Sequence, residues 1–224
     1  MTAQGQSRGV FVTFEGGEGS GKSTQIKRLA ERLKQGGLDV VVTREPGGSP
    51  GAEILRHLIL SGVGKMLGAE AETLLFAAAR DDHVRSVIAP ALARGQWVLC
   101  DRFYDSTRVY QGQLGQVDRA LMDSLQRVTI GGLKPDLTFI LDVPVDVGLR
   151  RATARRGNDR PDRFEAESVA FHQGLRDAYG AIAAVEPERC VLIDADHDAD
   201  SVAAAIWSAL TSRVTVGLQE RTSA

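Results

Sequence analysis

Short apolar runs recur along the chain, and the longer stretches between them carry apolar residues at helical spacing. The runs are rich in β-branched and aromatic residues, which is typical of strands. They are continuous rather than alternating, which indicates strands that are buried on both faces. The predicted strands are residues 10–14, 38–43, 97–100, 137–142 and 191–194.

Helices are predicted between these strands. After the first strand, Ile26, Leu29, Ala30 and Leu33 repeat at the spacing of one helical face. Because strands and helices alternate, the pattern predicts an α/β fold with a central parallel β-sheet flanked by helices. Ligands of such sheets bind beyond the carboxyl ends of the strands. The other predicted helices cover residues 52–60, 69–80, 82–94 and 106–128, the last interrupted near 112–115.

The length of 224 residues suits one α/β domain, and no internal repeat or low-complexity linker divides the chain. Two domains are compatible with this length but are not required. We therefore expect a single domain over 1–224, with flexible ends at about 1–9 and 214–224.

Composition narrows the class of protein. The formal net charge of -2 disfavours a general binder of nucleic acid or of membrane surfaces, because such proteins are usually basic. The first nine residues are polar and no apolar stretch has the length of a membrane helix, so we expect a cytoplasmic protein. Cys100 and Cys190 each adjoin an apolar run, which predicts buried, reduced thiols rather than a disulfide or a metal site.

The candidate chemistry begins at a glycine-rich octapeptide between the first strand and its helix. Its spacing, G-x-x-x-x-G-K-S, is that of a phosphate-binding loop, and a chance match in a chain this long has a probability of roughly 1%. Glycines let backbone N–H groups surround an anion, Lys22 would reach the β- and γ-phosphates, and the Ser23 hydroxyl would ligate Mg²⁺. The predicted ATP-binding residues are Gly16, Gly17, Glu18, Gly19, Ser20, Gly21, Lys22, Ser23 and Thr24.

Two further segments carry charges that suit phosphate chemistry. Asp101 and Arg102 directly follow a strand, so Asp101 would hold Mg²⁺ through water and Arg102 would bring its guanidinium to a phosphate; the alternative is a strand-end ion pair. Residues 150–163 hold six arginines, which favours a mobile lid that closes over phosphates and excludes water. The alternative there is a solvated run of charge.

Several motifs occur in the order found in bacterial thymidylate kinases, and the chain resembles that family from about residue 10 to 210. The resemblance implies the P-loop nucleoside monophosphate kinase fold with a mobile lid. It also implies an enzyme that transfers the γ-phosphoryl group of ATP to dTMP, with Mg²⁺, in dTTP synthesis. A homodimer is implied too, with helix 69–79 or 120–128 as the face. The motifs are the phosphate loop, Thr43-Arg44-Glu45-Pro46-Gly47-Gly48, Leu75-Phe76-Ala77-Ala78-Ala79-Arg80, Asp101-Arg102-Phe103, Ser106-Thr107-Arg108-Val109-Tyr110-Gln111-Gly112 and the arginine-rich lid.

The same resemblance implies roles on the acceptor side. Phe76 would stack on thymine, Arg80 would donate a hydrogen bond to its exocyclic oxygen, and Tyr110 would disfavour a ribose 2′-hydroxyl. Without the resemblance, Phe76 would be interpreted as a core residue because its neighbours are apolar. The dTMP residues implied are Glu18 for the 3′-hydroxyl, Arg44, Arg56 and Arg102 for the 5′-phosphate, Tyr110 near the sugar, and Phe76, Arg80, Thr107 and Gln111 at or around the base.

The family supplies its catalytic arginine either from the phosphate loop or from the lid. Here Gly19 and Ser20 occupy the loop position, so the chain resembles the second type. Arg151, Arg155, Arg156, Arg160 and Arg163 compete for the role, and Arg155 is our choice. The implied catalytic residues are then Lys22, Arg102 and Arg155, and the predicted metal ligands are Ser23 and Asp101.

Two rival functions stay open at this point. The nearer is a kinase of another nucleoside monophosphate; the other is a P-loop ATPase that acts as a switch or in DNA partitioning, which the lid and the near-neutral charge disfavour. Related kinases place adenine near Ala195 and Asp196. The four histidines, His57, His83, His172 and His197, are interpreted as surface or packing residues.

Overall fold

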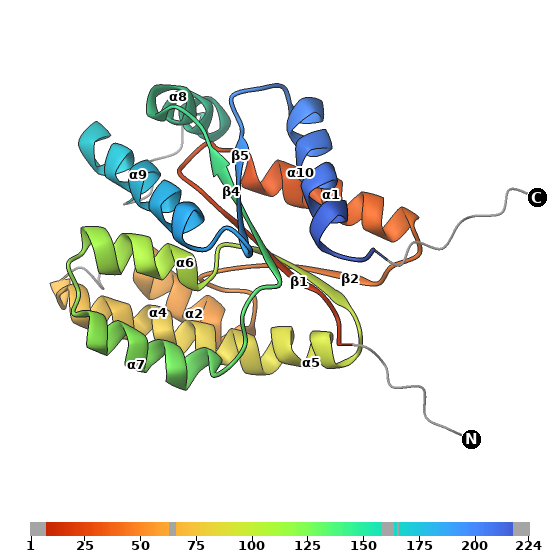
Figure 1. Ribbon diagram of the computed structural model, residues 1–224. Coiled ribbons are helices and arrows are strands. Elements are labelled where there is room, and N and C mark those ends of the chain that lie inside the picture. The colour runs from red at the N-terminus through yellow and green to blue at the C-terminus, as the bar shows by residue number, and fades with distance from the viewer. Residues whose placement is uncertain (1–7, 63–65, 158–163, 165, 217–224) are drawn as a thin grey trace, which may run out of the picture.

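A five-stranded parallel sheet forms the centre of the computed structural model, which describes residues 8–62, 66–157, 164 and 166–216. The strand order is β2-β3-β1-β4-β5, so β1 lies in the middle and β3 and β4 pair with it on either side (Figure 1). All five predicted strands are confirmed, with ends that differ by two residues at most. The strands are β1 Phe11–Glu15, β2 Val40–Arg44, β3 Trp97–Asp101, β4 Leu137–Asp142 and β5 Cys190–Asp194.

Helices follow the strands as predicted, and two stretches are wound as π-helix. The predicted break near 112–115 falls slightly later, between Leu114 and Arg119, because the chain first continues as π-helix. The helices are α1 Lys22–Gln35, α2 Pro50–Leu60, α4 Ala69–His83, α5 Ala89–Ala93, α6 Tyr104–Thr107, α7 Arg119–Ile130, α8 Val145–Arg156, α9 Val169–Val185 and α10 Ala199–Arg213, and the π-helical segments are η1 Val84–Ile88 and η2 Arg108–Leu114.

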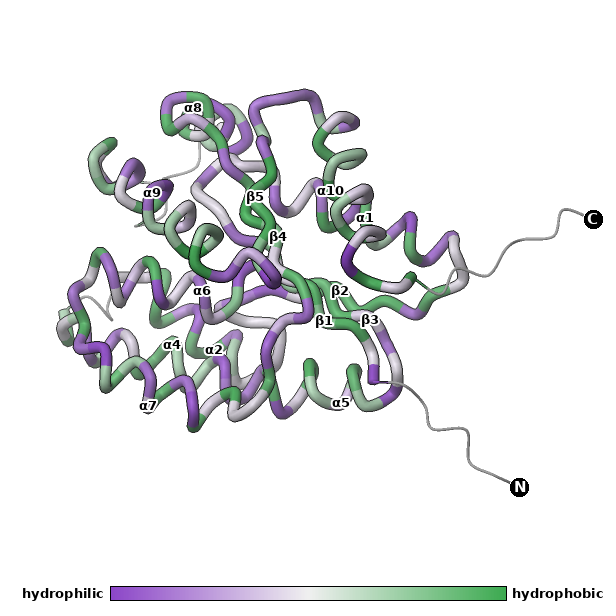
Figure 2. Tube along the Cα trace, viewed as in Figure 1, coloured by the Kyte–Doolittle hydropathy of each residue, from purple (hydrophilic) through white to green (hydrophobic). Residues whose placement is uncertain are grey.

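Successive residues of the central strand serve opposite faces of the sheet. Val12 and Phe14 pack with the apolar sides of α1 and α10, whereas Phe11 packs with η1 and α5 on the other face. Figure 2 shows the strands as a green band between the two sets of helices. Because helices cover both faces of the sheet, its strands need apolar residues on both sides. This explains why the strand segments of the sequence are continuous apolar runs.

The arginine-rich segment is only partly described. Arg150 to Arg156 form the last turns of α8, and Gly157 ends that helix with a φ of 63°. Residues 158–163, including Arg160 and Arg163, lie outside the described residues, as do 1–7 and 217–224 of the predicted flexible ends. That residues 150–163 act as a mobile lid stays a prediction.

Two smaller expectations concern the cysteines and the membrane. Cys100 and Cys190 are buried with free thiols, as predicted. Burial raises the pKa of the Cys190 thiol to about 12, so this thiol is protonated near neutral pH. Among the described residues, no helix combines the length and the apolar composition needed to span a bilayer.

Candidate active site

One pocket lies at the carboxyl edge of the sheet and brings most of the predicted site residues together. The strand register sets this up, because Phe14 of β1 and Arg44 of β2 both pair with Asp101 of β3. The loops after all three strands therefore begin at one level and face one cavity of about 320 Å³, a size that suits a small molecule. The predicted residues that line it are Glu18, Gly19, Ser20, Gly21, Lys22, Ser23, Thr24, Arg44, Arg56, Phe76, Arg80, Asp101, Arg102, Thr107, Tyr110, Gln111 and Arg155.

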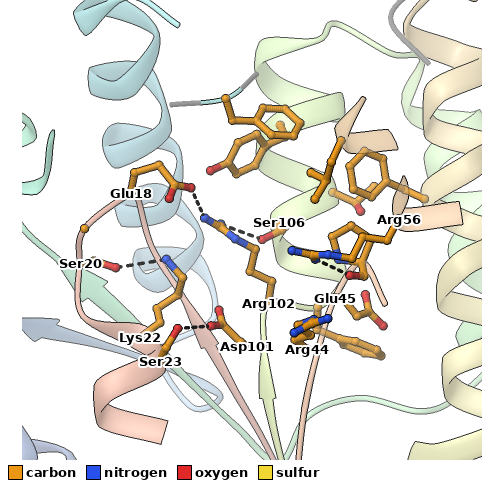
Figure 3. Close-up of a pocket in the computed structure, with 18 of the residues that line it drawn as sticks. Glu18, Ser20, Lys22, Ser23, Arg44, Glu45, Arg56, Asp101, Arg102 and Ser106 are labelled. Atoms are coloured by element: carbon orange, nitrogen blue, oxygen red, sulfur yellow. Dashed lines mark hydrogen bonds and ion pairs between the residues drawn. The ribbon is translucent and has the colours of Figure 1, made fainter. Parts of the chain in front are cut away.

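The phosphate loop runs from Gly16 to Gly21, between β1 and α1. Gly16 and Gly17 line the neighbouring cavity instead, but their carbonyl oxygens accept hydrogen bonds from Lys22 Nζ at 3.0 and 2.9 Å. Figure 3 shows the lysine folded back beneath the loop toward Ser20. Burial and the nearby Arg102 guanidinium lower the pKa of Lys22 to about 8. The loop thus holds a buried ammonium group at the start of a helix, where an anion is favoured.

Packing against α8 fixes the small residue in the phosphate loop. Gly19 has a φ of 67°, and a Cβ there would overlap the carbonyl oxygen of Gly148 on α8. An arginine at position 19 would need both a strained backbone and a displaced helix. The loop in this conformation has no room for an arginine at position 19.

A hydroxyl and a carboxylate stand together beside the loop as candidate Mg²⁺ ligands. Ser23 Oγ donates a hydrogen bond to Asp101 Oδ2 at 2.9 Å, which joins the start of α1 to the end of β3. Within the described ranges, no cluster of three or more His, Cys, Asp or Glu side chains could hold a metal. Two oxygen ligands fit Mg²⁺, because that ion usually keeps water and takes further oxygens from substrate phosphates.

Arg102 occupies the centre of the pocket and is held from several sides. Its Nη2 lies 2.7 Å from Glu18 Oε1, and its Nη1 donates to Gly16 O, Ser106 Oγ and Tyr179 OH at 3.2 to 3.3 Å. The backbone of Arg102 has a φ of 69°, an uncommon value for a residue other than glycine. Burial raises the pKa of Glu18, but Arg102 and Lys22 outweigh it, so the net pKa of Glu18 is lowered. The centre of the pocket therefore contains two cations and one ionised carboxylate.

Glu15, which the sequence did not single out, lies fully buried beneath Arg102. Its carboxylate accepts hydrogen bonds from Phe103 N–H at 2.8 Å, Ser106 Oγ at 2.6 Å and Tyr179 OH at 3.0 Å. Burial and the neighbouring Asp105 raise the pKa of Glu15 to about 7, although these donors act in the opposite direction. Glu15 thus fixes the backbone that follows Arg102 and the hydroxyls that support its side chain.

Phe76 and Arg80 of α4 line the same pocket. Phe76 is only partly buried and lines the cavity, so its interpretation as a core residue is not supported. Arg80 Nε donates to Glu45 Oε2 at 2.7 Å, and its Nη2 donates to Thr107 Oγ1 at 3.0 Å and to Phe103 O at 3.3 Å. The aromatic wall and the arginine are therefore available together, as base recognition needs.

Tyr110 and Gln111 belong to η2, a π-helical segment of a kind that often occurs at functional sites. The Tyr110 ring meets Phe164 edge to face, with 5.2 Å between centroids, and Arg102 lies over its face at 5.3 Å. Phe164, just after the arginine-rich segment, also lines the pocket, and no sequence motif had indicated it. Its signal was slight: an aromatic residue that directly follows a run of charge.

Arg44 and Arg56 also line the pocket. Arg44 Nη2 binds both carboxylate oxygens of Glu53 at 3.1 and 3.2 Å, and Arg56 Nη1 donates to Pro46 O at 2.6 Å. Figure 3 shows both across the pocket from the phosphate loop. They line the cavity as predicted, but each is also bound to protein acceptors.

The described lid arginines differ in where they bind. Arg150 pairs with Asp146 at the surface, and Arg151 Nη1 donates to Ala195 O at 2.8 Å, close to the segment expected at adenine. Arg155 lines the pocket and lowers the pKa of Glu18 through its charge. Of Arg150, Arg151, Arg155 and Arg156, the lid arginines that the structure describes, Arg155 is the one that lines the pocket with the phosphate loop.

The interpretation of the histidines needs one correction. His83 is fully buried, but it is more than a packing residue, because its ring nitrogens bind Glu45 Oε1 at 3.1 Å and Thr43 Oγ1 at 2.6 Å. Sequence reasoning missed both His83 and Glu45. The available signal was the spacing Arg80–His83, which places both side chains on one side of α4.

The chain is similar to known proteins of one family. Residues 14–206 match the model of the thymidylate kinase family. A thymidylate kinase of Nitrobacter winogradskyi is 72% identical over 92% of this chain and 90% of its own length. One of Bradyrhizobium diazoefficiens is 70% identical over 92% of this chain and 91% of its own length. The crystal structure of thymidylate kinase from Ehrlichia chaffeensis is 34% identical, with a TM-score of 0.73 over 91% of this chain and 99% of that one.

Proposed function

The chain belongs to the thymidylate kinase family, and from this premise we propose that it transfers the γ-phosphoryl group of ATP to dTMP with the help of Mg²⁺. One observation carries the proposal beyond family membership. A single pocket joins the phosphate loop to Phe76 and Arg80, so that a donor phosphate and a pyrimidine base can be held in the same cavity. Figure 3 shows Arg102 between the phosphate loop and Glu45, the hydrogen-bond partner of Arg80, so an acceptor phosphate bound by Arg102 would meet the donor there.

The donor side of the mechanism rests on the phosphate loop. Loop N–H groups and Lys22 would bind the β- and γ-phosphates, and Ser23 with Asp101 would hold the metal ion, which supplies positive charge to the phosphate oxygens. Lys22 already lies against the loop carbonyls at 2.9 to 3.0 Å. Phosphates at the start of α1 would therefore compete with carbonyl oxygens for its N–H groups.

The acceptor side uses the other end of the pocket. Arg102 would bind the 5′-phosphate of dTMP, with Arg44 and Arg56 nearby, while Glu18 would accept a hydrogen bond from the 3′-hydroxyl. An oxygen of that 5′-phosphate attacks the γ-phosphorus, and the bond from the γ-phosphorus to the β–γ bridging oxygen breaks, giving dTDP and ADP. The acceptor oxygen is already ionised at neutral pH, so no general base is required.

Catalysis then depends on position and charge. The transition state of phosphoryl transfer is loose, and its charge is spread over the equatorial oxygens. Lys22, Arg102 and Arg155 all line the pocket and would face this charge. A preorganised donor in a water-excluded site contributes about 2–4 kcal/mol to the barrier, so the loss of any one of them should be easy to measure.

Selection of the base follows from what Arg80 can donate. A guanidinium has only donors, so it binds an oxo group and rejects an exocyclic amino group, whose hydrogens would point at it. The test is an acceptor panel of dTMP, dUMP, UMP, dCMP and dGMP at matched ATP and Mg²⁺. We expect dTMP to be clearly preferred, and dCMP to be among the poor acceptors. Equal use of dCMP and dTMP would overturn the role given to Arg80.

We propose a homodimer as the assembled form. The two helices that the sequence indicated, α4 and α7, pack against each other and carry exposed apolar residues, with Leu74 50% and Val128 79% exposed. Analytical ultracentrifugation is expected to give twice the 24.1 kDa chain mass, and Leu74→Glu is expected to shift the species toward one chain. A cytoplasmic location and the lack of nucleic-acid partners stay predictions.

A further inference from the structure

Arg80 has one donor group that its neighbours leave available. Its Nε and Nη2 groups are occupied by Glu45, Thr107 and Phe103. Within the described part of the chain, Nη1 has no hydrogen-bond acceptor. Because Arg80 lines the pocket, Nη1 is the group that it can offer to a base. Which nitrogen is available depends on how the guanidinium is turned, and that depends on its protein partners.

Glu45 is the charged partner that sets this orientation. Its Oε2 binds Arg80 Nε at 2.7 Å and its Oε1 binds His83 Nδ1 at 3.1 Å, so each carboxylate oxygen has a donor. The three side chains are no more than 6% exposed. A charge-assisted hydrogen bond in such a dry place is strong, and a second donor on the same carboxylate restricts its rotation.

His83 is itself fixed by a hydrogen bond to Thr43, on the side of the ring away from Glu45. A carboxylate only accepts hydrogen bonds, so His83 Nδ1 carries the proton, and the Nε2 of a neutral ring then accepts from the Thr43 hydroxyl at 2.6 Å. Gly48 makes room for this contact, because a Cβ there would come within 2.5 Å of His83 Nε2. Thr43, Glu45 and Gly48 all belong to the motif at the end of β2. The contacts with His83 and Arg80 explain why a threonine, a glutamate and a glycine stand at these positions.

We propose that Glu45 and His83, anchored by Thr43, are positioning residues that hold the Arg80 guanidinium so that its Nη1 faces the 4-oxo group of the base. The proposal rests on the proposed function of this pocket. Its consequence is that selectivity for a 4-oxo over a 4-amino pyrimidine depends partly on residues that act by orienting Arg80, rather than by a hydrogen bond of their own to the base. Small displacements matter here, because a hydrogen bond weakens steeply with poor alignment.

The competing explanation is that the three residues only tie the loop after β2 to α4. A purely structural tie would affect every acceptor alike and would act in the same way with or without Arg80. A positioning role acts through Arg80, so it should vanish when the arginine is removed.

The experiment is a double-mutant cycle between Thr43→Val and Arg80→Ala, with steady-state kinetics for dTMP and dCMP. Thr43→Val is nearly isosteric and removes only the outermost hydrogen bond, so the protein should fold. We expect the KM for dTMP to rise about three- to tenfold, with kcat and the KM for ATP nearly unchanged. The dTMP-to-dCMP preference should fall by a similar factor. In the Arg80→Ala background the same change should have almost no effect.

Two further variants complete the test. Glu45→Gln, which keeps the shape but loses the charge, should lower the dTMP-to-dCMP preference more, by roughly ten- to a hundredfold. Thr129→Val on α7 is the matched control, because it also removes a threonine hydroxyl that makes a hydrogen bond within the protein, and it should leave the preference unchanged. If Glu45→Gln does not fold, the double-mutant cycle of Thr43→Val and Arg80→Ala is sufficient to test the positioning role.

The outcomes separate the inference from the function on which it rests. If the wild-type protein does not phosphorylate dTMP, the proposed function fails. If it does, but Thr43→Val changes dTMP and dCMP turnover equally, or has the same effect with and without Arg80, the positioning role is wrong. Calorimetric binding of dTMP gives the same comparison without turnover.

Discussion

Glu18 and Arg102 form an ion pair across the centre of the pocket, with 2.7 Å between Glu18 Oε1 and Arg102 Nη2 (Figure 3). Both side chains are largely buried, so water and salt screen their attraction less than that of a surface salt bridge. In the proposed mechanism the arginine binds the 5′-phosphate of dTMP and the carboxylate binds its 3′-hydroxyl. The same two residues therefore hold each other and define the two ends of the acceptor sugar phosphate.

Replacement of Arg102 by lysine should impair the reaction although the charge is kept. Lysine lacks the planar fork that reaches Glu18, Ser106 and a phosphate at once. We expect kcat/KM for dTMP to fall by about a hundredfold, measured with a coupled ADP assay. Arg213→Lys, on the surface end of α10, is the matched control and should show wild-type kinetics. Wild-type activity in Arg102→Lys would show that the fork is not needed.

The lowered pKa of Lys22 predicts a loss of activity at alkaline pH. Burial and Arg102 lower this pKa to about 8, so the ammonium form that binds phosphates predominates below pH 8 and is progressively lost above it. We expect kcat/KM for ATP, which reports the free enzyme, to fall about tenfold per pH unit above pH 8. A profile that is flat up to pH 9.5 would contradict the prediction.

The raised pKa of Glu15 predicts that folding stability falls as the pH rises. The unfolded chain loses this proton near its ordinary value of 4.5, whereas the folded chain keeps it until about pH 7. The folded state therefore binds more protons between these values, and its stability declines across that window and is level above it. The loss is on the order of 3 kcal/mol. Urea unfolding of the wild type and Glu15→Gln at pH 5 and 7.5 measures it.

Comparison of these two proteins removes the contribution of other titrating groups. The unfolding free energy of the wild type, minus that of Glu15→Gln, should be larger at pH 5 than at pH 7.5. A difference that does not change with pH, or that grows as the pH rises, would show that Glu15 is ionised throughout.

Arg155 should be needed for catalysis and Arg150 should not. Both lie on α8, but Arg155 lines the pocket, whereas Arg150 pairs with Asp146 in solvent. We expect Arg155→Ala to lower kcat by about a hundred- to a thousandfold with little change in the KM for dTMP. Arg150→Ala, the control from the same helix, should change kcat by less than twofold. Equal effects of the two substitutions would move the catalytic role to another lid arginine.

The strands and the phosphate loop could be predicted because their signals are local. The run Phe11 to Phe14 consists of aromatic and β-branched residues without polar alternation, as a strand buried on both faces requires, and the loop spacing is set by the shape of a phosphate. The helix predicted over 106–128, with a break near 112–115, did not include the π-helical winding that η2 shows at Tyr110 and Gln111. The spacing of apolar residues along the sequence does not distinguish a π-helical turn from an α-helical one.

Residues that support the site were harder to predict than residues that line it. In the sequence, Glu15 is simply the residue that ends an apolar strand. Tyr179 of α9, which donates a hydrogen bond to its carboxylate, lies 164 positions later in the chain and is brought there only by the fold. His83 likewise acts through Glu45, 38 positions away. The sequence contains no local pattern for such contacts, because they depend on which helix covers which face of the sheet.

The most direct test of the central claim is the stoichiometry of phosphoryl transfer by the purified chain. ATP, Mg²⁺ and dTMP are mixed with the enzyme, and ADP, dTDP and inorganic phosphate are separated by chromatography and counted. We predict equal amounts of ADP and dTDP, negligible inorganic phosphate, and almost no ADP when dTMP is left out. ADP formed with inorganic phosphate at a rate that does not depend on dTMP would identify a nucleotide hydrolase and contradict the proposed function.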